Sequence, residues 1–131
     1  MISLPDNHKR SISATFRILE KSVDEMKFIL TNTIKECTYE ISGDITEKHR
    51  EELLIKLNNL KQFISDFVTK YSLDKNITYQ SQIFNSKNSF WEIYLEEIYS
   101  KSIIKRHGDL DINKKEYDDD LRFLINFIKL M

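Results

Sequence analysis

Residues 53–71 read LLIKLNNLKQFISDFVTKY, and the spacing of their apolar side chains decides the fold. Large apolar residues recur at alternating steps of four and three positions, which is the period of one face of an α-helix. A seam that repeats every seven residues is typical of helices packed against other helices in a left-handed sense. The seam consists of Leu53, Leu57, Leu60, Ile64, Phe67 and Tyr71.

The same spacing runs through the N-terminal part of the chain and predicts one long helix over about residues 4–40. Pro5 stands in its first turn, and Gly43 marks its end because glycine tolerates the left-handed backbone at a helix terminus. Cys37 closes this seam and is predicted to be a small apolar filler there. The seam residues are Ile12, Phe16, Leu19, Val23, Met26, Leu30, Thr33 and Cys37.

Capping patterns predict where the second and the last helix begin. Asp44 followed three residues later by Glu47 fits a capping box, in which the two side chains satisfy free N–H groups at a helix start. Asn113 with Glu116 predicts the start of the last helix in the same way. The seam of that last helix is expected at Tyr117, Leu121, Leu124, Ile128 and Met131.

The third helix is predicted over residues 90–104, with Gly108 ending it. Its start lies either near residues 76–78 or at Ser89, which opens another capping-box pattern. A connection of about 15 residues without structure is uncommon in a compact domain, so helix or a short helical piece before Ser89 is favoured. Together these elements predict an all-α fold: a single domain over residues 1–131, built as a left-handed up-down-up-down four-helix bundle with short connections.

Composition and charge narrow the class of protein. Of the 131 residues, 40% are hydrophobic and 31% are charged, with 2 Gly and 1 Pro, which excludes collagen, low-complexity disorder and a turn-rich β-sandwich. Because 20 basic residues face 21 acidic ones, no global field recruits nucleic acid or an anionic membrane. One cysteine, no signal-peptide pattern and no apolar run of membrane-spanning length indicate a cytoplasmic protein.

The chain has few of the residue patterns that enzymes and metalloproteins use. His49 and His107 would lie at one end of the bundle, but no His-Glu-x-x-His, Glu-x-x-His or Cys-x-x-Cys motif accompanies them. The stretch from Asp109 onward begins like a calcium loop, yet Lys114 stands where an EF-hand needs glycine. No glycine-rich phosphate loop or nucleophile elbow is present either. We therefore expect no cofactor, no metal and no catalytic residues, and the sequence disfavours an enzymatic function.

The C-terminal half carries more apolar surface than one buried stripe requires. Eight of the last eleven residues are apolar, and Phe123, Phe127 and Leu130 lie on a different flank of the last helix from its seam. Trp91 and Tyr99 add aromatic surface from the third helix. These five residues are the candidate interface, since aromatic residues are enriched at protein contacts. Alternatively the first helix, residues 79–84 or residues 2–4 cover them within one chain.

The sequence thus predicts a non-enzymatic helical bundle that acts through protein–protein contacts, as a homodimer or a small hetero-complex. The alternative is a small-molecule- or metal-binding bundle, possibly enzymatic, that uses the His49/His107 end or the face formed by Trp91, Tyr94 and Tyr99. Nucleic-acid binding is disfavoured, because the clusters of Lys and Arg have acidic neighbours within a turn or two.

Overall fold

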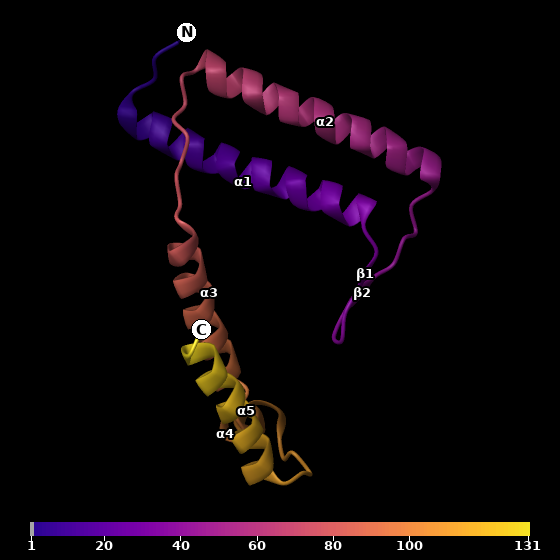
Figure 1. Cartoon of the computed structure of the whole chain (residues 1–131), viewed down its shortest axis with the longest axis vertical. Coiled ribbons are helices and arrows are strands. Elements are labelled where there is room, and N and C mark those ends of the chain that lie inside the picture. The colour runs from indigo at the N-terminus through magenta and orange to yellow at the C-terminus, as the bar shows by residue number, and fades with distance from the viewer. Residues whose placement is uncertain (1) are drawn as a thin grey trace. The chain divides into compact units, whose positions relative to one another are not determined.

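A computed structural model describes residues 2–131, and these form five helices and one small sheet (Figure 1). The all-α class predicted from the sequence is confirmed, since the only strands among the described residues are two of two residues each. In chain order the elements are α1 (Asp6–Thr31), β1 (Ile34–Lys35), β2 (Glu40–Ile41), α2 (Glu47–Lys70), α3 (Gln80–Glu96), α4 (Ser100–His107) and α5 (Lys114–Lys129).

The chain divides into two compact units, which are described one at a time. Unit 1 ends at Asn76 and holds α1, α2 and the two strands between them. Unit 2 comprises Ile77–Met131 and holds α3, α4 and α5. An up-down-up-down bundle of four helices is not confirmed: α1 packs on α2 within unit 1, and α5 packs on α3 and α4 within unit 2.

Unit 1 is a helical hairpin in which α1 and α2 lie side by side (Figure 1). Val23 of α1 and Leu57 and Ile64 of α2 form its buried core, and all three belong to the predicted seams. The rings of Phe16 and Phe67 stack at 4.4 Å between centroids, which extends the contact toward the start of α1. Further partly buried side chains around the core are Leu30, Leu60 and Val68.

The first helix is shorter than predicted, because α1 ends at Thr31 rather than near residue 40. Asn32 takes an extended backbone conformation, and its side-chain amide donates to the carbonyl of Phe28 at 2.9 Å, which caps the helix end. The chain then forms an antiparallel two-stranded ladder with Ile34 opposite Ile41. Cys37 lies in the turn of this hairpin and is exposed, so its prediction as a buried filler is wrong.

The second helix begins two residues later than the capping box at Asp44 predicts. Its N-cap is Thr46, whose hydroxyl accepts the backbone N–H of His49 at 3.2 Å. The Thr46 hydroxyl thus replaces the Asp44 carboxylate as the cap. Glu47 instead pairs with Arg50 at 3.0 Å, one turn further along the same helix.

Unit 2 is built on α5, which packs against both α3 and α4. Leu121 and Ile125 are its buried side chains. The predicted seam contains Leu121 but places Leu124 beside it, and Leu124 is 48% exposed. The N-cap of α5 is confirmed, since the Asn113 side chain accepts the backbone N–H of Glu116 at 3.2 Å.

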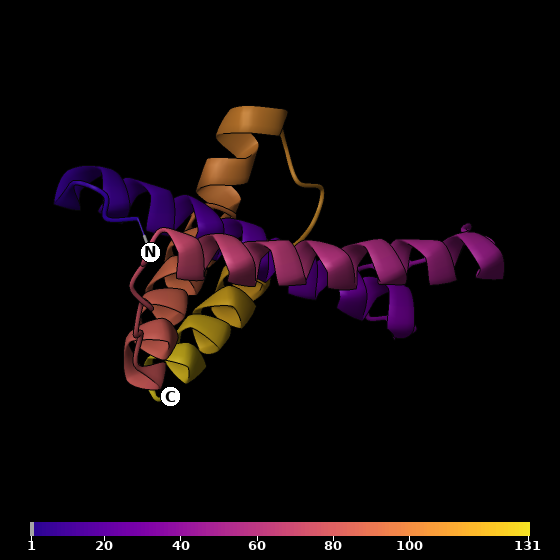
Figure 2. The same cartoon turned by 90° about the horizontal axis from the view of Figure 1, so that it is seen from above.

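The predicted third helix is two helices in the structure. As favoured from loop length, helical structure begins well before Ser89, at Gln80. It ends at Glu96, however, and residues 97–99 separate α3 from α4. The Tyr117 hydroxyl donates to the carbonyl of Ile98 at 2.6 Å, so the start of α5 lies beside the end of α3. The two helices are therefore antiparallel neighbours, as Figures 1 and 2 show.

Candidate functional site

Helix α5 is apolar on two sides, of which only one is buried. Leu121 and Ile125 face the interior of unit 2. Phe123 is 70% exposed, Phe127 is 59% exposed and Leu130 is 87% exposed. All three candidate interface residues of this helix are therefore open to solvent in the described part of the chain.

Helix α3 also exposes a stripe of large apolar side chains. Phe90, Trp91 and Tyr94 are all exposed, and the rings of Phe90 and Tyr94 stack with their centroids 6.2 Å apart. Asn88 and Leu95, half-buried, lie on the side of α3 that packs against α5. Helical spacing, at about 100° per residue, puts the aromatic stripe next to that packed side.

The exposed stripes of α3 and α5 lie on the same side of the helix pair. On each helix, seen from its own N-terminus, the stripe is displaced in the same rotational sense from the packed side. Because the two helices are antiparallel, displacements in the same sense turn both stripes toward one common side. We call this surface the contact face, and it consists of Phe90, Trp91, Tyr94, Phe123, Phe127 and Leu130.

Tyr99, the remaining candidate interface residue, is placed apart from these six. It belongs to residues 97–99 between α3 and α4 and is half-buried. Its ring lies beneath the guanidinium of Arg122, 5.9 Å from the ring centroid. Arg122 pairs with Asp119 at 2.8 Å on the polar side of α5. Trp91 and Tyr94 thus lie in the stripe of α3, whereas Tyr99 follows that helix and contacts Arg122.

An aspartate of α5 closes the N-terminus of α4, on a side of α5 away from Phe127. Asp118 accepts the backbone N–H of Ser100 at 2.8 Å and the Ser100 hydroxyl at 2.6 Å. The hydrogen bond from the Ser100 hydroxyl, followed by that from its backbone N–H, holds the pKa of Asp118 below its usual 3.8. Ser100 is only 6% exposed, so this contact fixes α4 on α5.

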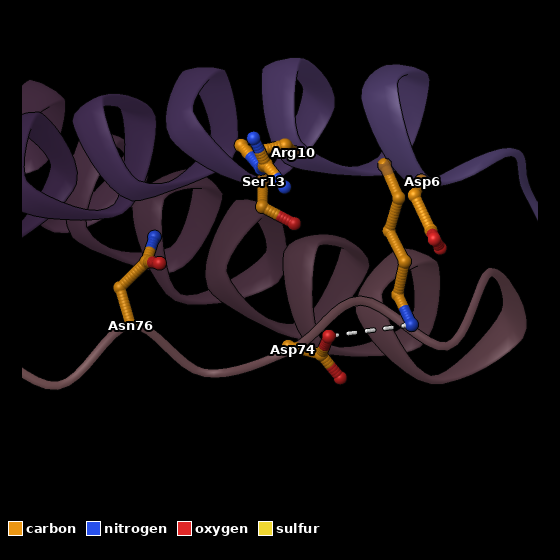
Figure 3. A pocket seen from close by; sticks show the side chains of 6 residues that line it. Asp6, Arg10, Ser13, Asp74 and Asn76 are labelled. Atoms are coloured by element: carbon orange, nitrogen blue, oxygen red, sulfur yellow. Dashed lines mark ion pairs between the residues drawn. The ribbon is translucent and has the colours of Figure 1, made fainter.

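Unit 1 contains a small polar pocket between the start of α1 and the segment that follows α2 (Figure 3). Its volume is 270 Å³. Lys9 pairs with Asp74 at 3.4 Å across it, as the dashed line in Figure 3 marks. Charges of both signs line the pocket, so it carries no strong field for an ion of either sign. The lining residues are Asp6, Lys9, Arg10, Ser13, Asp74 and Asn76.

A second, larger pocket of 510 Å³ lies in unit 1 where α1 ends and α2 begins. Leu30, Ile41 and Leu54 supply part of its apolar wall, and Arg50, already paired with Glu47, lies at its polar side. Sequence periodicity does not predict β2, which supplies Ile41 to this wall, because Thr33 and Cys37 continue the helical spacing into the hairpin.

The two histidines of the alternative metal hypothesis belong to different units. His49 lies in the first turn of α2, and His107 is the last residue of α4. Within residues 2–131, no group of three or more His, Cys, Asp or Glu side chains is arranged to hold a metal ion. Nor does any helix in that range combine the length and apolar character needed to cross a membrane.

Comparisons with protein-family models, with curated proteins and with solved structures find no match to this chain.

Proposed function

We propose that this protein is a non-enzymatic helical protein that acts through protein–protein contacts, in a homodimer or a small hetero-complex. The contact face of unit 2 would make those contacts. The observation that carries the proposal is the exposure of Phe123, Phe127 and Leu130 together on one flank of α5.

The chemistry of the contact face supports this proposal. Single exposed apolar residues are common on soluble proteins, but contiguous patches of large apolar side chains mark interaction sites. Four of the six residues of the face are aromatic side chains of Phe or Trp, and Tyr94 adds a fifth ring. Aromatic residues dominate the well-packed centres of interfaces because each buries a large area at little cost in rotamer entropy.

A four-helix bundle formed between two chains, rather than within one chain as predicted from the sequence, belongs to this proposal. Helices α3 and α5 supply two antiparallel helices with an apolar face, and two helices of a partner would complete a bundle. A cytoplasmic location is likewise proposed, since the exposed thiol of Cys37 suits a reducing compartment.

Charge substitutions on α5 test the proposal. Phe127→Glu places a carboxylate in the middle of the contact face, and Leu130→Glu places one at its end. Lys129→Glu is the matched control, because Lys129 is exposed on the polar side of the same helix. The readouts are the helical circular dichroism signal, which reports folding, and the molar mass or partner binding, which reports contact.

If the contact face serves a partner, Phe127→Glu and Leu130→Glu keep the helical signal of the unmodified protein and lose association. Lys129→Glu keeps both. If these side chains belong to the core of a single folded chain, Phe127→Glu loses helical signal and aggregates, because a charge is then buried without a partner. That second result would exclude the proposed function.

A further inference from the structure

We infer that the contact face binds a second copy of this chain, in an antiparallel two-fold arrangement held in register by Lys87 of one copy and Asp120 of the other. This inference rests on the proposed function, since it names the partner of the same face. It is carried by unpaired charges of opposite sign in the two apolar stripes.

Lys87 is the charged residue within the stripe of α3. Its helical neighbours at three and four positions on either side include Phe84, Phe90 and Trp91, which are all exposed. Lys87 itself is exposed, and in the range 2–131 no ion pair involves it. A solvated ammonium group therefore stands among aromatic rings without an acidic partner.

Asp120 holds the corresponding position in the stripe of α5. Phe123, Leu124 and Phe127 follow it at three, four and seven positions, on the same flank of the helix. Asp120 is exposed and, over the described residues, takes part in none of the ion pairs or side-chain hydrogen bonds. Among the described residues, the stripe of α5 thus presents two unpaired carboxylates, Asp120 and, one turn earlier, Glu116, whereas the stripe of α3 presents one unpaired ammonium group.

The charges of Lys87 and Asp120 lie toward opposite ends of the contact face. The contact of Tyr117 with Ile98 places the start of α5 beside the end of α3. Asp120 is in the second turn of α5 and therefore lies near that end. Lys87 is in the second turn of α3 and lies toward the other end. Within one unit the two side chains are thus kept apart along the helix axes, and they do not pair.

A two-fold axis through the centre of the face brings these charges together between copies. An axis that lies in the plane of the face, perpendicular to the line from Lys87 to Asp120, exchanges the places of these two residues. Lys87 of each copy then meets Asp120 of the other, and the aromatic residues between them pack against those of the second copy. An isologous contact uses one patch twice and therefore needs a patch that is complementary to itself in charge as well as shape. The positive and negative ends of this face meet that requirement.

Two charge-reversed chains test the inference by mixing. Lys87→Glu alone sets a carboxylate against Asp120 at both symmetry-related contacts, and Asp120→Lys alone sets two ammonium groups together at each of them. Each variant alone should raise the dissociation constant of the dimer by about tenfold or more. In an equimolar mixture a heterodimer of twice 15.7 kDa should reappear, because one of its two contacts then joins two reversed charges of opposite sign and the other joins the two unmodified residues. Lys115→Glu, on the polar side of α5, is the matched control and should leave the dimer unchanged.

The inference is overturned if the mixture associates no better than the separate variants, or if the unmodified chain stays at 15.7 kDa at every concentration. Circular dichroism of each variant confirms that it is folded before its mass is read. Failure here is distinct from failure of the proposed function. A folded Phe127→Glu variant with a monomeric parent excludes only the second copy, whereas an unfolded Phe127→Glu variant excludes the contact face itself.

Discussion

Asp118 holds Ser100 through both oxygens of its carboxylate, 18 positions away in the sequence. One oxygen accepts the backbone N–H of Ser100 at 2.8 Å, and the other accepts its hydroxyl at 2.6 Å. A helix normally receives its N-terminal cap from the residue before it, yet Tyr99 offers no such hydrogen bond. A side chain of α5 thus supplies the cap of α4, which ties the two helices together.

This contact makes the stability of unit 2 sensitive to acid. The pKa of Asp118 is lowered by folding, so its contribution is complete above the ordinary value of 3.8 and is lost as the pH falls through the folded value. We expect Asp118→Asn to lower the melting temperature at neutral pH and to reduce the further loss on acidification. Asp111→Asn, in the loop before α5, is the control. Equal acid dependence in Asp118→Asn and the unmodified protein would contradict this role.

The core of unit 1 predicts that two leucines of the seams contribute differently to the free energy of unfolding. Leu57 is 7% exposed within the core, so Leu57→Ala should cost about 2–5 kcal/mol of unfolding free energy. Leu19, expected to be core from its spacing, is 36% exposed, and Leu19→Ala should cost less than about 1 kcal/mol. Urea denaturation measures both. Similar costs at the two positions would show that the packing of α1 on α2 is different.

The start of α2 predicts a second contrast, between the observed cap and the expected one. Thr46→Ala removes the hydroxyl that accepts the His49 N–H, and should destabilise unit 1 by about 0.5–2 kcal/mol. Asp44→Ala should change the stability by less than about 0.5 kcal/mol, because Asp44 is exposed outside the helix. Thermal unfolding of the two variants checks this. A larger effect from Asp44→Ala would restore the capping box predicted from the sequence.

Helical periodicity predicts the helices and their buried faces. It fails where contacts between residues far apart in the sequence set the boundary of a helix. The seam of residues 53–71 supplies Leu57 and Ile64 to the core, as predicted. The break between α3 and α4 has no such signal, since residues 97–99 contain neither Gly nor Pro. The partners that fix it, Tyr117 with Ile98 and Asp118 with Ser100, are 18 or 19 positions apart in the sequence.

The end of α1 escapes prediction because a periodic pattern is not by itself evidence of a helix. Thr33 and Cys37 continue the spacing of the seam, but the polar run Thr31–Asn32–Thr33, with its two β-branched threonines, favours an extended chain there. The exposed stripe of α5 is visible in the sequence, because it needs only the helical period and a surplus of apolar residues. Its continuation on α3 requires the antiparallel pairing of the two helices.

The most direct test of the contact face is the molar mass of the unmodified protein by light scattering across a range of concentrations, measured beside Phe127→Glu. The unmodified chain should rise from 15.7 kDa toward twice that mass, while the folded variant stays at 15.7 kDa. A mass of 15.7 kDa for both proteins at every concentration, or an equal rise in both, would contradict self-association through this face.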